Sequence, residues 1–251
     1  MAARTVAALQ RSKTSRDRNL APTLPAEVAE IVELLDLRAI SYRLRPGQEI
    51  VSEGKRCAAV FLLTEGIAMR YRILRDGQRQ ILNFLVPGDF AGIASSRFDN
   101  AVFTVKTLTP TVVSPIPISR LAALLETQPR LASVLLNVFS SDSAMLGEHL
   151  ISLGRRRAIA RVAHLLLELH ARLRRVGLAD ERAFRLPLTQ EMISDALGLS
   201  IPYVNRVLQE LRLDGLLTIR DQLVVIDNPE ELATLADFKM TYLRPVLSAA
   251  A

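Results

Sequence analysis

The alternation of hydrophobic and polar positions between residues 40 and 118 is typical of short β-strands separated by turns. Asp76-Gly77 lies between two apolar runs, where glycine supplies the positive φ of a hairpin turn. Seven runs share this character: ISYRL, EIVS, AVFLLTE, IAMRYRIL, RQILNFL, FTVKTLT and TVVSPIPI. Strands of this length and spacing predict a small antiparallel barrel or jelly roll.

Helical periodicity is found on both sides of these strands. Residues 25–37 carry an apolar stripe that starts with Pro25, and Ser119 is expected to cap a short helix. Pro129 then begins a long helix with a sustained apolar stripe. The positions of this stripe are Leu131, Val134, Leu135, Val138, Met145, Leu146 and Leu150. After a complete barrel, such a stripe predicts either a two-fold homodimer interface or packing on the barrel itself.

The pattern becomes helical again beyond the run Gly154-Arg155-Arg156-Arg157, which we interpret as a domain break. Residues 158–175 form an amphipathic helix and residues 177–185 a loop. Residues 188–213 contain two short helices joined at Gly198, where a tight turn needs positive φ. Residues 215–227 follow as two strands, a wing. Helices and wing in this order predict a winged helix-turn-helix, which is a DNA-binding module.

The second helix of this motif has two unlike faces. Its inner face carries Val204, Val207, Leu208 and Leu211, and its outer face is polar. Arginine can bond both acceptors of guanine, and asparagine can address adenine. Residues at the helix N-termini can bond phosphates. The predicted DNA-contacting residues are Thr189, Gln190, Ser200, Tyr203, Asn205, Arg206 and Gln209.

These patterns together predict an α+β protein with an antiparallel β-roll, a long dimerisation helix and a C-terminal winged helix-turn-helix. The expected segments are a flexible basic tail (1–24), a sensor-like β-roll (25–128), a dimerisation helix (129–154), a DNA-binding domain (155–227) and a helical extension (228–251).

Charge and composition support this interpretation. The net charge is +6, and residues 155–220 hold twelve arginines against seven acidic residues, as expected of a phosphate-binding module. No apolar run is long enough to cross a membrane, and the N-terminus lacks the apolar stretch of a signal peptide. A single cysteine, Cys57, excludes an internal disulfide, so a reducing cytoplasm is the expected location.

The order of β-roll, long helix and winged helix-turn-helix resembles the Crp/Fnr family of bacterial regulators over roughly residues 25–227. The turns that carry the resemblance are Pro46-Gly47, Gly54, Gly66 and Gly88-Asp89-Phe90-Ala91-Gly92, and the C-terminal match is TQEMISDALGLSIPYVNRVLQELRLDGLL. The resemblance implies a homodimer on a two-fold related site in double-stranded DNA. RNA polymerase would be a further partner if the chain is an activator.

Two departures from the family pattern change what is expected. Family members that bind cyclic AMP carry a Glu after the glycine, an Arg-Ser pair and a Thr-Ser pair in the long helix. Here these positions hold Ile93, Phe103-Thr104 and Leu146-Gly147, so no cyclic AMP binding and no other cofactor are predicted. Ile201 and Pro202 occupy the first turn of the recognition helix, where many members carry Arg and Glu, so the preferred DNA sequence should differ.

The signal that the β-roll senses is left open. Cys57 is a candidate redox residue because the neighbouring Lys55 and Arg56 should lower the pKa of its thiol. His149, His164 and His170 lie outside the barrel and are interpreted as packing or surface residues. A metal-dependent enzyme of the cupin type needs histidines in the barrel, and residues 40–118 contain none. The other alternative is a signalling protein that binds a small molecule and has a degenerate DNA module.

Overall fold

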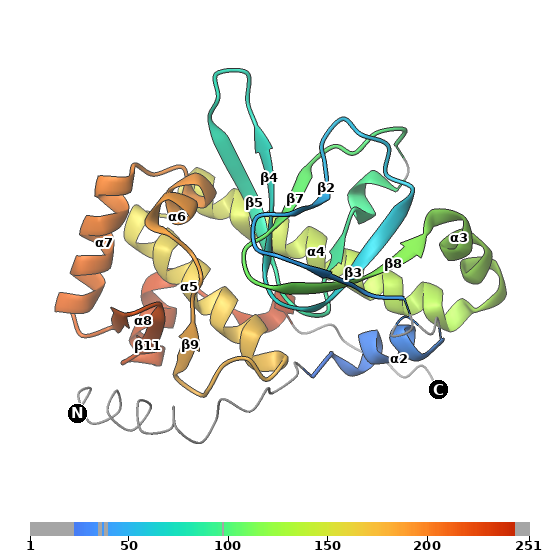
Figure 1. Cartoon of the computed structure of the whole chain (residues 1–251). Coiled ribbons are helices and arrows are strands. Elements are labelled where there is room, and N and C mark those ends of the chain that lie inside the picture. Colours follow the sequence, from blue (N-terminus) through green and yellow to red (C-terminus); the bar gives the residue numbers. More distant parts are fainter. Residues whose placement is uncertain (1–22, 35–36, 38–39, 97, 244–251) are drawn as a thin grey trace.

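The β-roll consists of two four-stranded antiparallel sheets in the computed structural model, which describes residues 23–34, 37, 40–96 and 98–243 (Figure 1). One sheet has the order β1 (Tyr42–Leu44), β8 (Thr111–Pro117), β3 (Ala59–Glu65), β6 (Phe90–Ala91). The other has the order β2 (Glu49–Val51), β7 (Thr104–Thr107), β4 (Ala68–Ile73), β5 (Arg79–Leu85). The predicted antiparallel β-roll and its α+β class are confirmed.

One detail of the roll agrees with the expectation and one differs from it. The β4–β5 hairpin turns at Asp76-Gly77 as predicted, with Gly77 at φ 85°. Strand β6 is additional, since its two residues pair with Phe61 and Leu62 of β3. A strand of two residues is too short to show an alternating pattern, so the sequence showed this segment only as a turn.

Three helices cover one face of the roll. They are α2 (Ala26–Leu34), α3 (Ile118–Thr127) and the 27-residue α4 (Pro129–Arg155). Helix α3 begins directly after β8 with Pro117 at its N-cap, so Ser119 lies inside the helix and does not cap it. The polypeptide passes from strand β8 into α3 without a loop. Ser119 therefore already has a helical backbone and cannot occupy the extended N-cap position.

The apolar stripe of α4 is divided between two environments. Leu131, Val134 and Leu135 are buried with α2 and the outer face of the roll, and Met145 is buried as well. Part of the stripe thus packs on the roll, which was one of the two predicted alternatives, and the homodimer interface stays a prediction. Five other apolar side chains of α4 are exposed: Leu136, Phe139, Leu146, Leu150 and Ile151.

The C-terminal part of the chain is built around α5 (Ala158–Arg175). It continues through β9 (Ala183–Arg185), α6 (Gln190–Leu197), α7 (Ile201–Leu213), β10 (Leu217–Arg220), β11 (Leu223–Ile226), α8 (Pro229–Ala236) and η3 (Met240–Leu243). Residues 177–185 are not entirely a loop, because β9 joins the wing as a third strand beside β11. Its partner lies some forty residues further along the chain, so local periodicity could not reveal the pairing.

Only part of the two terminal segments can be compared with the expectations. Residues 1–22 of the predicted basic tail and residues 244–251 lie outside the described residues. The predicted helix after residue 228 is present as α8, but it ends at Asp237, which adopts φ 47°, and η3 follows. Helix α8 packs against α5, and η3 contacts both α4 and α5.

The β-roll and the C-terminal part share one hydrophobic core. Met69, Ile81 and Phe84 of the β4–β5 hairpin are buried together with Leu166 of α5 and Ile193 of α6. In the part of the chain that the structure describes, no helix is long and apolar enough to span a membrane.

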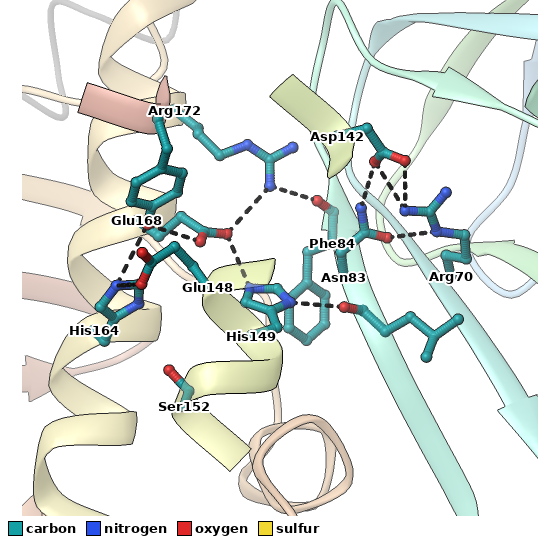
Figure 2. A network of polar contacts seen from close by, with 12 residues as sticks. Arg70, Asn83, Phe84, Asp142, Glu148, His149, Ser152, His164, Glu168 and Arg172 are labelled. Carbon is teal, nitrogen blue, oxygen red and sulfur yellow. Dashed lines mark hydrogen bonds and ion pairs between the residues drawn. The ribbon is translucent and has the colours of Figure 1, made fainter. Parts of the chain in front are cut away.

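A buried polar network crosses the same junction (Figure 2). Arg172 of α5 donates to the carbonyl oxygen of Phe84 at 2.8 Å and pairs with Asp89 of the roll. Tyr242 of η3 donates to Glu168 of α5 at 3.0 Å, and His164 stacks on the Tyr242 ring. The C-terminal segment thus closes the network from the side opposite the roll.

Candidate DNA-binding interface

The first helix of the motif begins and ends as its sequence predicts. The Thr189 hydroxyl oxygen accepts the backbone N–H of Met192 at 3.2 Å, so Thr189 is a true N-cap. Helix α6 ends at Gly198, which adopts φ 61° and lets the chain turn within two residues into α7. The Ser194 hydroxyl donates to the carbonyl oxygen of Leu199 and fastens the turn to α6.

The start of α7 differs from the prediction in one respect. Ser200 occupies the N-cap position with an extended backbone, but its side chain makes no capping hydrogen bond. Pro202 in the first turn explains part of this difference, because it has no N–H for a cap to bind. The Ser200 side chain is exposed to solvent.

The two faces of α7 are as unlike in the structure as in the sequence. Val204, Val207 and Leu211 are at most 2 % exposed and pack into the shared core. The opposite face is open to solvent and carries four of the predicted DNA-contacting residues: Tyr203, Asn205, Arg206 and Gln209. Burial of one face therefore fixes which side chains a duplex can meet.

Two contacts organise this open face. The Arg206 guanidinium carbon lies 5.1 Å from the centre of the Tyr203 ring, which is a cation–π arrangement. The Gln190 side chain reaches across from α6, and its Nε2 donates to Asn205 Oδ1 at 3.1 Å. The structure thus brings Gln190, Asn205, Tyr203 and Arg206 into two neighbouring pairs. Thr189 and Ser200 flank them at the helix N-termini.

The wing is a two-residue hairpin. Strands β10 and β11 pair from Leu217↔Ile226 to Arg220↔Leu223, and Asp221 and Gln222 both adopt positive φ at the turn. A turn of this kind matches the right-handed twist of the strands it joins. Arg220 and the two turn residues are exposed to solvent at the wing tip.

Sequence reasoning missed a contact that holds the motif on the β-roll. Arg79 at the start of β5 pairs with Asp195 at 2.6 Å and with Glu191 at 3.3 Å, both on α6. The Gln80 amide also donates to the carbonyl oxygen of Ala196 at 3.2 Å. These residues are 112 to 116 positions apart in the chain, so no local pattern could have indicated them.

Both halves of the chain match models of known domains. Residues 42–128 match the cyclic nucleotide-binding domain, and residues 160–235 match the Crp-like helix-turn-helix domain. The nitrogen fixation regulation protein FixK of Rhizobium meliloti is 30 % identical over 77 % of this chain and 85 % of its own length. The chain belongs to the Crp/Fnr family.

Further relatives agree with this assignment. The transcriptional activator protein anr of Pseudomonas aeruginosa is 28 % identical over 88 % of this chain and 91 % of its own length. The structure of FixK2 from Bradyrhizobium japonicum superposes with a TM-score of 0.71 at 28 % identity, covering 78 % of this chain and 96 % of that one. Crp/Fnr proteins are transcription regulators and not enzymes, so this chain is a DNA-binding transcription regulator of the Crp/Fnr type.

The positions that hold cyclic AMP in some Crp/Fnr members are filled differently here. Ile93 is buried beside the outer face of the roll, and the hydroxyl of Thr104 is occupied by the backbone N–H of Glu53 at 3.1 Å. A side chain on Gly92 would meet the sulfur of Cys57 at 3.1 Å, so the glycine is packed from inside the roll. None of these positions presents a cation to a phosphate.

Cys57 itself is in an environment opposite to the one predicted. The thiol is buried and donates to the carbonyl oxygen of Ala59 at 3.2 Å, while Lys55 and Arg56 are exposed. Burial raises the pKa of the Cys57 thiol, so the expectation that the two cations lower it was wrong. Among the described residues, no three His, Cys, Asp or Glu side chains are grouped to hold a metal ion.

Proposed function

We propose that this regulator binds its DNA site through the exposed face of α7, with Arg206 and Asn205 contacting base edges in the major groove. The observation that carries the proposal is the placement of Arg206 over the Tyr203 ring on a face of α7 that is open to solvent. A guanidinium positioned over the ring can direct two of its N–H groups to the O6 and N7 atoms of guanine. Thr189, Gln190, Ser200 and Gln209 would contact phosphates or neighbouring bases.

We propose that the DNA-binding species is a homodimer joined through α4. Leu136, Phe139, Leu146 and Leu150 are exposed at spacings of three, seven and four residues, which is the seam of a two-helix coiled coil. An apolar seam of this length is unusual on a monomer surface. Two copies related by a two-fold axis would place one α7 in each of two major grooves, about 34 Å apart.

The proposed regulator acts without cyclic AMP and in the cytoplasm. Gly92 is packed by its neighbours and the Thr104 hydroxyl is already hydrogen-bonded, and neither position offers a cation to a cyclic phosphate. These features support this part of the proposal. In this proposal residues 25–128 form the sensor-like roll, 129–154 the dimerisation helix and 155–227 the DNA-binding domain. Residues 228–251 are the extension, and RNA polymerase is a partner if the protein activates transcription.

Binding to fragments of genomic DNA at two salt concentrations tests the proposal. A sequence-specific regulator should bind a small set of fragments, with an affinity that falls as salt is raised because phosphate contacts release counterions. The common sequence in those fragments should contain two related half-sites with centres about one helical turn apart. Uniform weak binding to all fragments would contradict sequence-specific recognition by α7.

A further inference from the structure

A cavity of about 640 Å³ lies where the β-roll, α4, α5 and η3 meet, which is away from the interior of the roll. Its walls come from the end of β5 and the loop that follows it, from the middle of α4, from the last turn of α5 and from η3. Cavities of a few hundred cubic ångströms are of the size that holds small organic ligands. The parts that surround it are those that set the position of the DNA-binding module relative to the roll.

The walls are largely apolar. Val86 and Phe90 come from the roll, Val138 from α4, Val176 from the residue after α5, and Leu243 from η3. All of these side chains except Val138 are buried. An apolar body is therefore the part of a ligand that this space accommodates best.

The two carboxylates in the walls are both engaged within the protein. Asp89 accepts from Arg172 and from the backbone N–H of Val86 at 2.7 Å, and Asp142 accepts from Arg70 at 2.8 Å. Figure 2 shows Asp142 held between Arg70 and Asn83. Both carboxylates of the wall are thus neutralised within the protein.

The cations of the wall extend further toward solvent. Arg174 and Arg175, in the last turn of α5, are exposed lining residues, and Arg172 lies one helical turn before Arg175 in the interior. Arg172 and Arg70 already balance the two carboxylates, so the further guanidinium of Arg174 makes this side of the cavity electropositive. A ligand with a negative group would be oriented by this side, with its apolar end toward Val138 and Phe90.

We propose that this junction cavity binds a small organic monoanion with an apolar body, such as a medium-chain or aromatic carboxylate. Because the cavity exists only while the roll, α4 and α5 stay together, such a ligand binds the docked arrangement and stabilises it. Its regulatory effect rests on the proposed DNA binding by α7. The binding itself does not, so it can be measured in the absence of DNA.

Titration calorimetry of the full chain with octanoate and with 1-octanol tests the proposal, because the two probes differ only in the charged group. We expect octanoate to bind once per chain, about tenfold more tightly than 1-octanol, and to raise the thermal midpoint. Ala171→Phe, which fills the cavity from α5, should abolish both effects. Arg174→Glu should reduce octanoate binding to the level of 1-octanol, whereas the matched control Arg43→Glu on exposed β1 should not.

Three outcomes would overturn the proposal. Equal binding of octanoate and 1-octanol would remove the need for a negative group. Octanoate binding that survives both Ala171→Phe and Arg174→Glu would place the site elsewhere. Binding that is seen only after deletion of residues 1–22 would show that this segment, which precedes Pro25 of the cavity wall in the sequence, competes for the space. Arg174 is exposed, so Arg174→Glu is expected to fold, and it tests the proposed anion site even if Ala171→Phe fails to fold.

Discussion

His149 of α4 forms a pair with the buried Glu168 of α5, in which the imidazole Nε2 lies 3.2 Å from the Glu168 carboxylate. The other ring nitrogen, Nδ1, lies 2.8 Å from the carbonyl oxygen of Leu82 in β5. Both nitrogens therefore face acceptors, and only the doubly protonated ring can donate to both. This one side chain ties the roll, the long helix and the DNA-binding part together (Figure 2).

The stability of the junction should consequently depend on pH. Burial lowers the pKa of His149, but the hydrogen bond and charge of Glu168 outweigh it and raise the pKa above its ordinary value. A folded-state pKa above the unfolded one means that the pair stabilises the fold fully below the unfolded pKa. This contribution is lost as pH rises through the folded pKa.

The measurement is thermal unfolding of the parent and His149→Gln from mildly acidic to alkaline pH. Glutamine can donate to only one of the two acceptors with good geometry and carries no charge, so we expect a loss of about 2 kcal/mol at the acidic end. The difference between the two proteins should shrink as pH rises. His164, whose pKa is lowered to about 4 by burial and by Arg156, destabilises the fold as pH falls below its unfolded pKa. This trend has the opposite sign and is common to both proteins. A difference that is constant with pH would contradict a protonated His149.

Arg206 should carry base specificity with the help of Tyr203. Arg206→Ala should weaken binding to the selected DNA site by about 1–3 kcal/mol and relax the preference at one position per half-site. Tyr203→Leu removes the ring beneath the guanidinium and should also weaken binding. In the double variant the two losses should not add, because Tyr203 acts by orienting Arg206. Fluorescence anisotropy on matched and mismatched sites gives both quantities, and fully additive losses would show independent roles.

Leu150 should be required for dimerisation. Its side chain is 72 % exposed on the outer face of α4, where a charge in the proposed seam would face its own copy. Leu150→Glu is expected to give a monomer in sedimentation analysis and to lose high-affinity DNA binding. Leu213→Glu is the matched control, since Leu213 is 86 % exposed at the end of α7 and lies outside the seam. An unchanged dimer in Leu150→Glu would show that the subunits associate elsewhere.

Cyclic AMP should neither bind to this protein nor alter its affinity for DNA. Gly92 is packed by Cys57 and Val51, and Thr104 is engaged with Glu53, so a cyclic phosphate would have to displace core contacts without gaining an ion pair. Titration calorimetry with cyclic AMP, followed by anisotropy with and without it, gives the answer. A clear heat of binding or a tighter DNA complex would show that another part of the roll supplies the missing charge.

The local sequence was sufficient to define most elements of the DNA-binding motif. Thr189 caps α6, Gly198 supplies the positive φ of the turn, and Val204, Val207 and Leu211 define the buried face of α7. Each of these effects acts over one or two helical turns, so periodicity and residue type predict them. The same locality explains why the hairpin at Asp76-Gly77 was predicted correctly.

Tertiary structure alone decided what these elements contact. It divided the stripe of α4 between the roll and solvent, and it joined β9 to the wing. It also buried Cys57, which raises the pKa of the thiol, whereas the neighbouring cations in the sequence had suggested a lower pKa. It also placed Arg79 against α6, and it brought His149 of α4 and Arg172 of α5 to the backbone carbonyls of Leu82 and Phe84 in β5. Burial, pKa and ion pairing depend on what surrounds a group in space. Local sequence specifies the surfaces of each element, and only their packing determines which surfaces meet.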